Sequence, residues 1–285
     1  MALAQNGLNT QLKIAAWNGG AHVAPTFGGD TLRGLGGNDG LNAGEGDNLL
    51  YGGLDADRLF AGDGDDLLYG GAGNDELIGS GGRDRVSGGG GTDTFYVGGG
   101  GRFTVTTVNL ATGKAVLDGD NTSVLSGIED VVGDSGRDAL TGDAGANRLE
   151  GFTGDDTLLG GAGNDTLYGS LGADLMNGGG GVDVFLYRDA AESKADRNID
   201  QIDGFALAQD IIDLSLIDAS PGGDDSAFVF IGSAAFSGSG PQVRIVVDGV
   251  AQTTTVQVRL DGSVADDMTI LLDNDLALTA ANFVL

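Results

Sequence analysis

A large apolar residue recurs every nine positions along two stretches of the chain, and an Asp or Asn stands two positions before each one. Three residues centred on the apolar position can form a short strand, in which successive side chains point to opposite faces. We therefore expect the apolar side chain to face inward, its two neighbours to face outward, and the other six residues to form a turn. The apolar series is Leu32, Leu41, Leu50, Leu59, Leu68, Leu77, Val86 and Phe95, then Leu140, Leu149, Leu158, Leu167, Met176 and Phe185.

The Asp or Asn occupies position six of a nine-residue unit in which the apolar residue is position eight. Eight units follow one another from residue 25 to 96, and six more from 133 to 186, without an insertion. A fixed short period of this kind decides the architecture before any local propensity does. The position-six series is Asp30, Asp39, Asn48, Asp57, Asp66, Asp75, Asp84 and Asp93, then Asp138, Asn147, Asp156, Asp165, Asp174 and Asp183.

Glycine dominates the remaining positions, with 55 in the chain, and it permits the positive φ angles that tight turns need. Two units make one coil with a strand in each of two sheets, so units of the same parity stack on the same edge. Their position-six carboxylates should lie one strand spacing apart, roughly 5 Å. The sequence thus predicts an all-β fold with two parallel β-rolls, joined by a β-hairpin segment and followed by a β-rich C-terminal cap.

Stacked carboxylates repel, by about 1 kcal/mol per pair in water and about 3 kcal/mol at an effective dielectric near 20. A hard cation between successive turns would reverse the sign of this interaction. Calcium accepts six to eight carboxylate and carbonyl oxygens in irregular geometry, whereas magnesium demands a smaller octahedron. Zinc and copper prefer Cys and His, and the chain has no Cys and only His22. The expected cofactor is therefore Ca²⁺, with multiple ions per chain.

The unit Gly70–Ile78 (Gly-Gly-Ala-Gly-Asn-Asp-Glu-Leu-Ile) resembles the GGxGxDxUx repeat of the RTX family of secreted proteins. The resemblance implies a parallel β-roll with each ion between two turns on one edge. One turn would contribute its Asp and the carbonyls of positions two and four, and the next its Asp and the carbonyls of positions one and three. The implied carbonyl ligands include Gly53, Gly70, Gly71, Gly73, Gly88 and Gly90, then Gly160, Gly161, Gly163, Gly178 and Gly180.

The sites are not expected to bind equally well. Asn48 and Asn147 replace the carboxylate with a neutral amide and should bind calcium less tightly. Asp30 belongs to a poorly matching first unit, and its site is expected to be marginal. The firmest ligands are expected to be Asp66, Asp75, Asp84, Asp93, Asp165, Asp174 and Asp183.

The period divides the chain into five parts. Residues 1–24 are expected to cap the open end of the first roll, 25–96, and residues 133–186 form the second roll. Between them, 97–132 is predicted to contain a hairpin around Ala111–Gly113, and its Glu129 falls where a position-six Asp would stand and is a further candidate ligand. Residues 187–285 leave the nine-residue frame.

The C-terminal part resembles the region that follows the roll in serralysin-type secreted proteases. The likeness lies in Asp200–Phe205, Asp210–Ser215 and the ending Leu278–Leu285, although Asn282 stands where the family's terminal motif has an acidic residue. The resemblance implies a roll cap (187–285) that also carries an uncleaved type I secretion signal. It therefore implies a secreted, extracellular protein with a type I exporter as partner.

The charge balance excludes one class of partner. With 42 acidic against 14 basic residues the formal net charge is −28, and such a polyanion does not bind nucleic acid backbones. No apolar run reaches the 18 residues of a transmembrane helix. The first twenty residues lack the continuous apolar core of a secretory signal peptide.

Catalytic motifs are missing from the sequence. There is no HExxH zinc motif and no GxSxG nucleophile motif, so the chain is expected not to be an enzyme. Two functions remain open. The first is a secreted calcium-binding protein that folds on calcium after type I export and has a structural, adhesive or host-interaction role. The second is the calcium-binding and secretion portion of a larger secreted hydrolase, a serralysin-like protease or lipase, without its catalytic domain.

Two tyrosines suggest a surface partner. Tyr51 and Tyr69 both occupy position nine, one coil apart, so they should be neighbours on the outer face of one sheet, near Arg33. Stacked aromatic rings can receive sugar rings, which makes a glycan or cell-surface partner a candidate. Ordinary cross-strand packing explains the same spacing.

Overall fold

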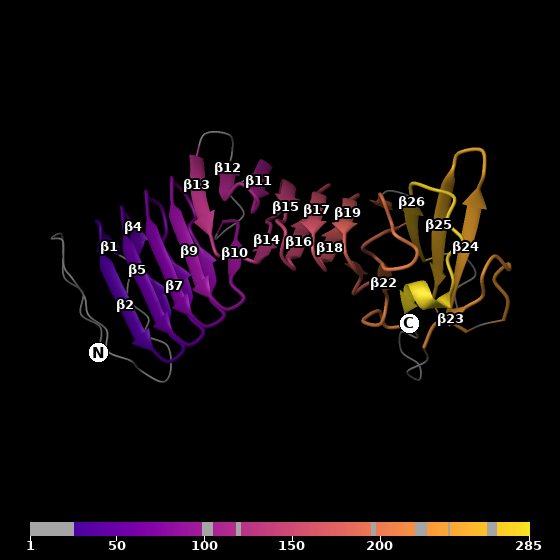
Figure 1. The fold of residues 1–285 in the computed structure, drawn as a ribbon, viewed down its shortest axis with the longest axis horizontal. Coiled ribbons are helices and arrows are strands. Elements are labelled where there is room, and N and C mark those ends of the chain that lie inside the picture. Colours follow the sequence, from indigo (N-terminus) through magenta and orange to yellow (C-terminus); the bar gives the residue numbers. More distant parts are fainter. Residues whose placement is uncertain are drawn as a thin grey trace. The chain divides into compact units, whose positions relative to one another are not determined.

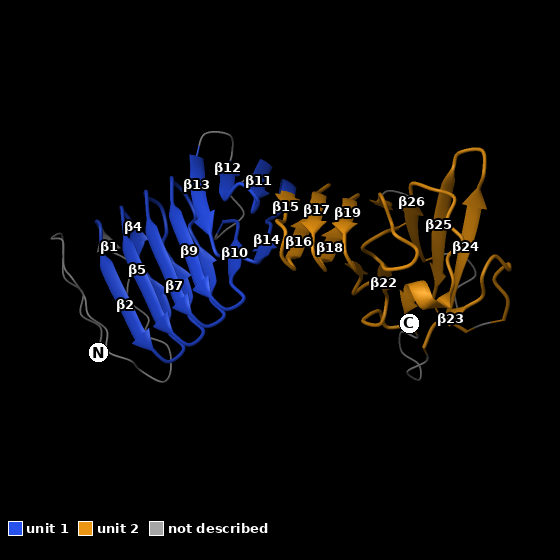
Figure 2. Cartoon of the chain, in the orientation of Figure 1, with its two compact units in different colours: residues 1–139 blue, residues 140–285 orange. Residues whose placement is uncertain are grey.

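The computed structural model describes residues 26–98, 105–117, 121–194, 198–219, 227–238, 240–260 and 267–285, and the predicted N-terminal cap (1–24) lies outside them. The described chain is almost entirely β-structure (Figure 1). It forms two compact units, residues 1–139 and 140–285, which are coloured separately in Figure 2. Each unit is described by itself below.

Unit 1 contains two parallel stacks of strands. One stack consists of β2 (Thr31–Gly36), β5 (Leu49–Leu54), β7 (Leu67–Ala72) and β9 (Arg85–Gly90), in that order. The facing stack consists of β3 (Gly40–Asn42), β6 (Arg58–Phe60), β8 (Glu76–Ile78), β10 (Thr94–Tyr96) and β14 (Asp130–Val132). A short parallel pair is formed by β1 (Thr26–Phe27) and β4 (Gly44–Glu45). The chain thus alternates between two parallel sheets, as in a β-roll.

The register confirms the expected coil length. Leu50 pairs with Leu68 and Tyr51 with Tyr69, each pair eighteen residues apart, and Leu59 pairs with Leu77 in the facing sheet. The position-eight side chains fill the space between the sheets, and none is more than 2% exposed. Position-one residues, such as Gly70 and Ala61, are buried beside them, so the interior holds one large and one small residue per unit.

The strands are longer than the sequence predicts. In β5 and β7 the ladder runs from position seven through position three of the following unit, with Gly53 opposite Gly71 and Leu54 opposite Ala72. The expectation that positions one to six all form a turn is therefore wrong for this sheet. Position one breaks the pairing and positions two and three resume it.

A three-stranded insertion follows the first stack. The strands are β11 (Val105–Asn109), β12 (Lys114–Leu117) and β13 (Asn121–Ser126). β11 pairs antiparallel with β12, and β12 pairs antiparallel with β13. β13 then pairs parallel with β9, with Val124 opposite Arg85, so the insertion continues the sheet without a nonapeptide turn. The strand β15 (Arg137–Thr141) spans the division between the units.

Unit 2 repeats the two-stack arrangement. One stack consists of β17 (Thr157–Ala162), β19 (Leu175–Gly180) and β21 (Asp200–Ile202). The other consists of β16 (Arg148–Thr153), β18 (Thr166–Leu171), β20 (Val184–Leu186), β22 (Ile211–Asp213) and β27 (Phe283–Val284). Beyond β21, the sheet of β17 and β19 is extended in order by β26 (Met268–Leu272), β25 (Thr253–Arg259), β24 (Gln242–Asp248) and β23 (Val229–Phe230). β24 pairs antiparallel with β25, as the alternating side chains predict.

The C-terminal residues are part of the folded unit. A short 3-10 helix, η1 (Ala280–Asn282), begins with a capping box. The Thr279 hydroxyl accepts from the Ala281 N–H, and the Asn282 side chain accepts from the Thr279 N–H. The final strand β27 pairs with β22, with Phe283 opposite Ile212, and the Asn282 side chain donates a hydrogen bond to the Leu207 carbonyl at 2.8 Å. The segment expected to carry the secretion signal is therefore held by backbone pairing once the unit has folded.

Two bulky residues occupy a backbone conformation that favours glycine. Leu35 and Phe152 both stand at position two, with φ of 80° and 81°, and they are 54% and 50% exposed. Most other units have Gly at this position, for example Gly71 with φ of 122°. The left-handed region costs a residue with a Cβ roughly 1–2 kcal/mol.

We expect Phe152→Gly to stabilise unit 2 by about 0.5–1 kcal/mol, because the relieved strain exceeds the added entropy of a glycine in the unfolded chain. Leu171→Gly is the control. Leu171 is similarly exposed (46%) but stands at position three, outside the positive-φ residues, so its replacement should destabilise the unit. Chemical denaturation at constant calcium measures both changes. A loss of stability in Phe152→Gly equal to that in Leu171→Gly would show that the position is not strained.

Candidate calcium sites

The position-six side chains form buried columns along the edges of the rolls. In each column, the backbone N–H of one residue donates to Oδ1 of the residue eighteen positions later, at 2.7–3.0 Å. Asp39, Asp57, Asp75 and Asp93 form one column of unit 1, and Asp30, Asn48, Asp66 and Asp84 form the other. In unit 2, Asn147, Asp165 and Asp183 are linked in the same way, as are Asp156 and Asp174.

Burial is nearly complete along these columns. The position-six side chains from Asp39 to Asp93 are at most 3% exposed, and those from Asp138 to Asp183 at most 4%. Asp30 is only half-buried, which is consistent with its poorly matching unit. Asp138 and Asn147 begin the second repeat stretch, and each accepts from an N–H at position two of its own turn, that of Asp134 and Asp143 respectively.

The second carboxylate oxygen is the unusual feature of these aspartates. It is buried and has no hydrogen-bond partner, whereas the first oxygen accepts from the backbone in all of them except Asp39, whose two oxygens both lack a partner. An unsatisfied buried oxygen of this kind costs about 1–3 kcal/mol, and more when it is charged. A ligand that coordinates these oxygens would remove that cost. The oxygens are Oδ2 of Asp39, Asp57, Asp66, Asp75, Asp93, Asp165, Asp174 and Asp183.

Backbone carbonyls converge on the same oxygens. A Cβ placed on Gly34, at position one, would lie 2.6 Å from Oδ2 of Asp39 and 2.5 Å from the carbonyl oxygen of Gly52 in the next turn of that edge. A Cβ on Gly70 would collide with Oδ2 of Asp75 and lie 2.7 Å from the Gly88 carbonyl. The carboxylate of one turn and the position-one carbonyl of the next thus meet beside a glycine.

The other predicted carbonyls also border the next turn. A Cβ on Gly89 or Gly91 would collide with the carbonyl of Gly71 or Gly73, and a Cβ on Gly71 would collide with the Gly53 carbonyl. In unit 2 the Gly178 carbonyl and Oδ2 of Asp165 meet beside Gly160, and the Gly161 and Gly163 carbonyls abut Gly179 and Gly181. The Gly90 and Gly180 carbonyls accept hydrogen bonds from the N–H groups of Gly73 and Gly163 at 2.8 Å. The residues predicted as ligands therefore lie on the same edges as the aspartate columns.

Asn48 indicates where a cation would fit. Its side-chain nitrogen donates to the carbonyls of Gly46 at 2.6 Å, Ala61 at 3.2 Å and Gly44 at 3.4 Å. These carbonyls belong to positions four and two of its own turn and to position one of the next turn, which are predicted ligand positions. A polar hydrogen donor thus occupies the place that the aspartate sites offer to a metal ion.

We expect Asn48→Asp to add one calcium ion per chain, because the replacement restores a carboxylate among carbonyls that already converge. Equilibrium dialysis with metal analysis counts the ions. Asn74→Asp adds the same charge at an exposed position five, outside the buried columns, and should leave the count unchanged. An unchanged number of bound calcium ions in Asn48→Asp would contradict the assignment of these carbonyls as a calcium site.

The donor set fits calcium better than a transition metal. Among the described residues, no group of three or more His, Cys, Asp or Glu side chains could hold a metal ion. The candidate sites instead combine a carboxylate with backbone carbonyls, as beside Gly34 and Gly70. Such all-oxygen, irregular coordination is the kind that Ca²⁺ accepts.

Residues outside the repeats extend the columns. Glu129 accepts from the Asp93 N–H at 2.8 Å, and its neighbour Asp130 pairs with Thr94, which places Glu129 at position six of a shortened turn. The Gly127 carbonyl meets Oδ2 of Asp93 beside Gly88, where the position-one carbonyl of a complete turn would lie. The candidate role of Glu129 is thus supported by its place in the column.

Two further acidic residues, which the nine-residue period does not predict, belong to the columns. Asp200 accepts from the Asp174 N–H at 3.0 Å, and Asp210 accepts from the Asp183 N–H at 3.1 Å. Both are buried, and Ile202 and Ile212 pair with the position-eight residues Met176 and Phe185. Both segments share the spacing of an Asp two positions before a large apolar residue with the repeats. This spacing did not predict them as position-six residues, because they follow Asp174 and Asp183 after 26 and 27 residues and not after the regular eighteen.

Burial raises the pKa of the column aspartates in the metal-free chain. The pKa of Asp66 and that of Asp84 rise to about 7, and those of Asp57 and Asp93 rise to about 6. The main cause is loss of hydration, and the backbone N–H donated to each carboxylate opposes it. Neighbouring carboxylates add to the rise, for example Asp75 and Glu129 around Asp93.

These shifts give the metal-free chain a pH dependence of definite sign. The folded form binds protons that the unfolded form, with ordinary aspartate pKa values, releases between about pH 4 and 7. In chelator, β structure should therefore increase as the pH falls from 8 to 5, measured by circular dichroism. The double variant Asp66→Asn, Asp84→Asn lacks two carboxylates whose pKa is strongly raised and should respond less. Greater loss of structure at pH 5 than at pH 8 would contradict this prediction.

The tyrosine pair lies as the sequence predicts. The Tyr51 and Tyr69 rings stack at a centroid distance of 5.1 Å and an interplanar angle of 11°. The Arg33 guanidinium lies 4.1 Å from the Tyr51 centroid and covers the outer end of the stack. The free ring face belongs to Tyr69, which is 41% exposed.

Comparison with protein-family models gives two matches. Residues 86–285 match the peptidase M10 serralysin C-terminal model, which is more than half of the chain. Four overlapping copies of the RTX calcium-binding nonapeptide repeat match residues 26–59, 42–77, 51–86 and 69–102. No curated protein sequence matches the chain. Within the described residues, no helix has the length and apolar character needed to cross a membrane.

Two solved structures are similar to parts of this chain. A subunit of the Azotobacter vinelandii mannuronan C5-epimerase, solved in solution, is 27% identical over 51% of this chain and 76% of its own length, with a TM-score of 0.39. The extracellular lipase LipA from Serratia marcescens is 19% identical over 93% of this chain, with a TM-score of 0.27. The match covers only 40% of the lipase chain.

Proposed function

Because the chain belongs to the peptidase M10 serralysin C-terminal family and carries RTX calcium-binding nonapeptide repeats, we propose that it is a secreted protein that folds when it binds several calcium ions outside the cell. The observation that carries the proposal is the set of buried carboxylate oxygens without hydrogen-bond partners, at least one in each of eight described aspartates. Calcium would bind them together with the convergent carbonyls. The role of the folded protein would be structural, adhesive or host-directed rather than catalytic.

We place the first roll at 25–96, the connecting hairpin segment at 97–132 and the second roll at 133–186. The antiparallel pairing of β11 with β12 supports the hairpin, and the eighteen-residue registers of each unit support the rolls. The site between Asp75 and Asp93 and that between Asp165 and Asp183 would be among the firmest.

Type I export would precede folding. Regions of the serralysin C-terminal family are typical of proteins exported by that route, and residues 187–285 would carry the signal. In the folded unit the last strand pairs with β22 through Phe283, so an exporter would engage the end of the chain only before this pairing forms. Low calcium in the cytosol keeps the columns repulsive and the chain open for transport.

Co-expression with a type I exporter tests the export route. The full chain should appear in the medium, whereas a chain without Leu278–Leu285 should stay in the cells. The control is a chain with Asp165→Asn and Asp183→Asn, which weakens calcium binding but leaves the terminal segment intact. It should be exported and remain poorly folded. Equal export of the full and shortened chains would overturn the proposed signal.

A second candidate function rests on the family itself. The matching model describes the C-terminal part of a peptidase, which favours a calcium-binding and secretion portion of a larger secreted hydrolase. An immunoblot of the natural secreted product against residues 133–186 distinguishes the two functions by mass. A product much heavier than 28.5 kDa would favour the hydrolase portion.

A further inference from the structure

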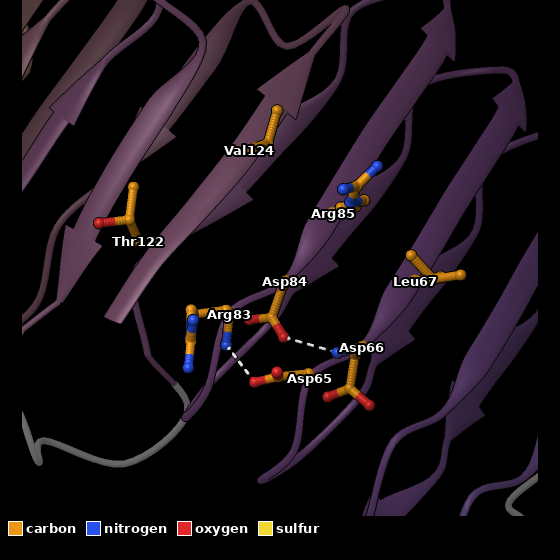
Figure 3. Close-up of a pocket in the computed structure, with 8 residues that line it drawn as sticks. All are labelled: Asp65, Asp66, Leu67, Arg83, Asp84, Arg85, Thr122 and Val124. Carbon is orange, nitrogen blue, oxygen red and sulfur yellow. Dashed lines mark hydrogen bonds between the residues drawn. The ribbon is translucent and has the colours of Figure 1, made fainter. Parts of the chain in front are cut away.

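A pocket of about 440 Å³ opens on the outer face of unit 1, where β13 joins β9 (Figure 3). It lies where the column of Asp30, Asn48, Asp66 and Asp84 ends, and the proposed calcium coordination does not use it. The pocket is lined by Asp65, Asp66, Leu67, Arg83, Asp84, Arg85, Thr122 and Val124.

The pocket exists because the inserted strand replaces a nonapeptide turn. Ser123 of β13 stands where the next position-six residue would be, and its hydroxyl accepts from the Asp84 N–H at 2.9 Å. Because Ser123 takes the place of the next position-six residue, the column of position-six carboxylates on this edge ends at Asp84 among the described residues. Thr122 and Val124, on either side of Ser123, face outward and form one wall of the pocket.

Two arginines flank Asp84. Since side chains alternate along an extended chain, Asp84 turns inward while Arg83 and Arg85 turn outward, and both are exposed. Neither guanidinium forms an ion pair with a described residue. In a chain with 42 acidic and 14 basic residues, two guanidinium groups in one pocket that have no ion-pair partner among the described residues are available to an anionic ligand.

The surroundings favour a ligand with both an anionic group and an apolar face. Arg85 lies between Leu67 of β7 and Val124 of β13 in the register of the sheet, so its charge is flanked by aliphatic side chains. Figure 3 shows this row on the upper side of the pocket, and Arg83 beside Asp65 and Asp84 on the lower side. The Thr122 hydroxyl adds a hydrogen-bonding group. Guanidinium groups bind carboxylates through two parallel hydrogen bonds, and aliphatic side chains suit the face of a ring.

Calcium would change the charge of the pocket. The described residues that line it include three carboxylates and two guanidinium groups, a formal charge of −1, which one divalent ion at Asp66 and Asp84 would change to +1. The third carboxylate, Asp65, already accepts from the Arg83 backbone N–H at 2.9 Å. An anion would thus be repelled from the metal-free pocket and attracted to the calcium-loaded one.

We propose that, in the calcium-loaded protein, this pocket binds an acidic sugar, with Arg83 and Arg85 contacting its carboxylate and Leu67 and Val124 contacting its ring. The inference rests on the proposed function, because the pocket attracts anions only when calcium neutralises Asp66 and Asp84. A volume of about 440 Å³ is far larger than a single inorganic oxyanion needs and accommodates one sugar ring.

Titration of the ¹⁵N-labelled, calcium-loaded chain with glucuronate tests the inference by nuclear magnetic resonance. The amide signals of Arg85 and Val124 should shift with a dissociation constant of about 1 mM, which is the strength that ligand efficiencies give for one small ring. Arg83→Gln and Arg85→Gln should each weaken binding at least tenfold. Arg58→Gln is the matched control, because Arg58 pairs with Glu76 at 3.2 Å on the facing sheet and should leave binding unchanged.

Uncharged glucose and free sulfate complete the experiment. Glucose should not shift these signals, and sulfate at equal concentration should not displace glucuronate. Equal binding of glucose or sulfate, or unchanged affinity in both arginine variants, would overturn the acidic-sugar site. Circular dichroism of each sample separates the two proposals: a calcium-folded chain that ignores glucuronate defeats only this inference, whereas a chain that does not fold with calcium defeats the proposed function as well.

Discussion

In an excess of chelator, the chain is expected to lose most of its β structure, and addition of about 1–5 mM calcium should restore it. Without the ion, each buried column keeps unsatisfied oxygens and closely spaced carboxylates. Extracellular calcium modules bind at about 10⁻⁴–10⁻³ M. At 1 mM free calcium and a dissociation constant near 10⁻⁴ M, each site adds about 1.4 kcal/mol to the folded state.

The size of this effect follows from the number of sites. Five such sites together contribute about 7 kcal/mol, which lies within the 5–15 kcal/mol that separates folded from unfolded states in ordinary domains. Circular dichroism follows the transition, and magnesium at the same concentration is the control, because it tolerates irregular carbonyl coordination poorly. A β signal that persists in excess chelator would contradict the dependence on calcium.

The second large effect is expected from Gly70→Ala. A Cβ at this position would collide with Oδ2 of Asp75 and lie 2.7 Å from the Gly88 carbonyl. The turn must therefore move, and the two oxygens that would share an ion separate. Overpacking of a buried site typically costs about 1–3 kcal/mol, and loss of the ion adds to that figure. We expect a loss of about 3 kcal/mol at 1 mM calcium.

Gly90→Ala is the matched control for this replacement. Gly90 stands at position three, has no atom within 4 Å of its ideal Cβ, and keeps its carbonyl when it is replaced. Ala72 and Ala162 already occupy position three in other units. Its replacement should change stability by less than about 0.5 kcal/mol. Denaturant unfolding at fixed calcium compares the two variants, and equal losses would contradict the proposed geometry at position one.

The period of the sequence predicted the repeating parts of the fold because every unit contributes one large side chain to the same interior. Leu50 and Leu68 pair as expected, and the resemblance to RTX repeats and to the serralysin C-terminal region is confirmed. The continuation of strands into positions one to three was not predicted. It depends on pairing between glycines such as Gly53 and Gly71, and glycine-rich segments carry no alternating pattern from which a strand can be recognised.

The candidate site was predicted as far as the period extended. The position-six residues named from the sequence are all buried except Asp30, which is half-buried. Asp200 and Asp210 were missed because they join the columns after intervals of 26 and 27 residues. The hydrogen bonds from the Asn48 side-chain nitrogen to three backbone carbonyls could not be predicted either. The orientation of the amide depends on the positions of those carbonyls, which the sequence does not give.

The most direct measurement is a crystal structure of the chain grown with calcium, with anomalous scattering used to locate the ions. The proposal predicts an ion in contact with Oδ2 of Asp75 and the Gly88 carbonyl, and another with Oδ2 of Asp165 and the Gly178 carbonyl. Density for water alone beside these oxygens, at a calcium concentration that saturates folding, would contradict it.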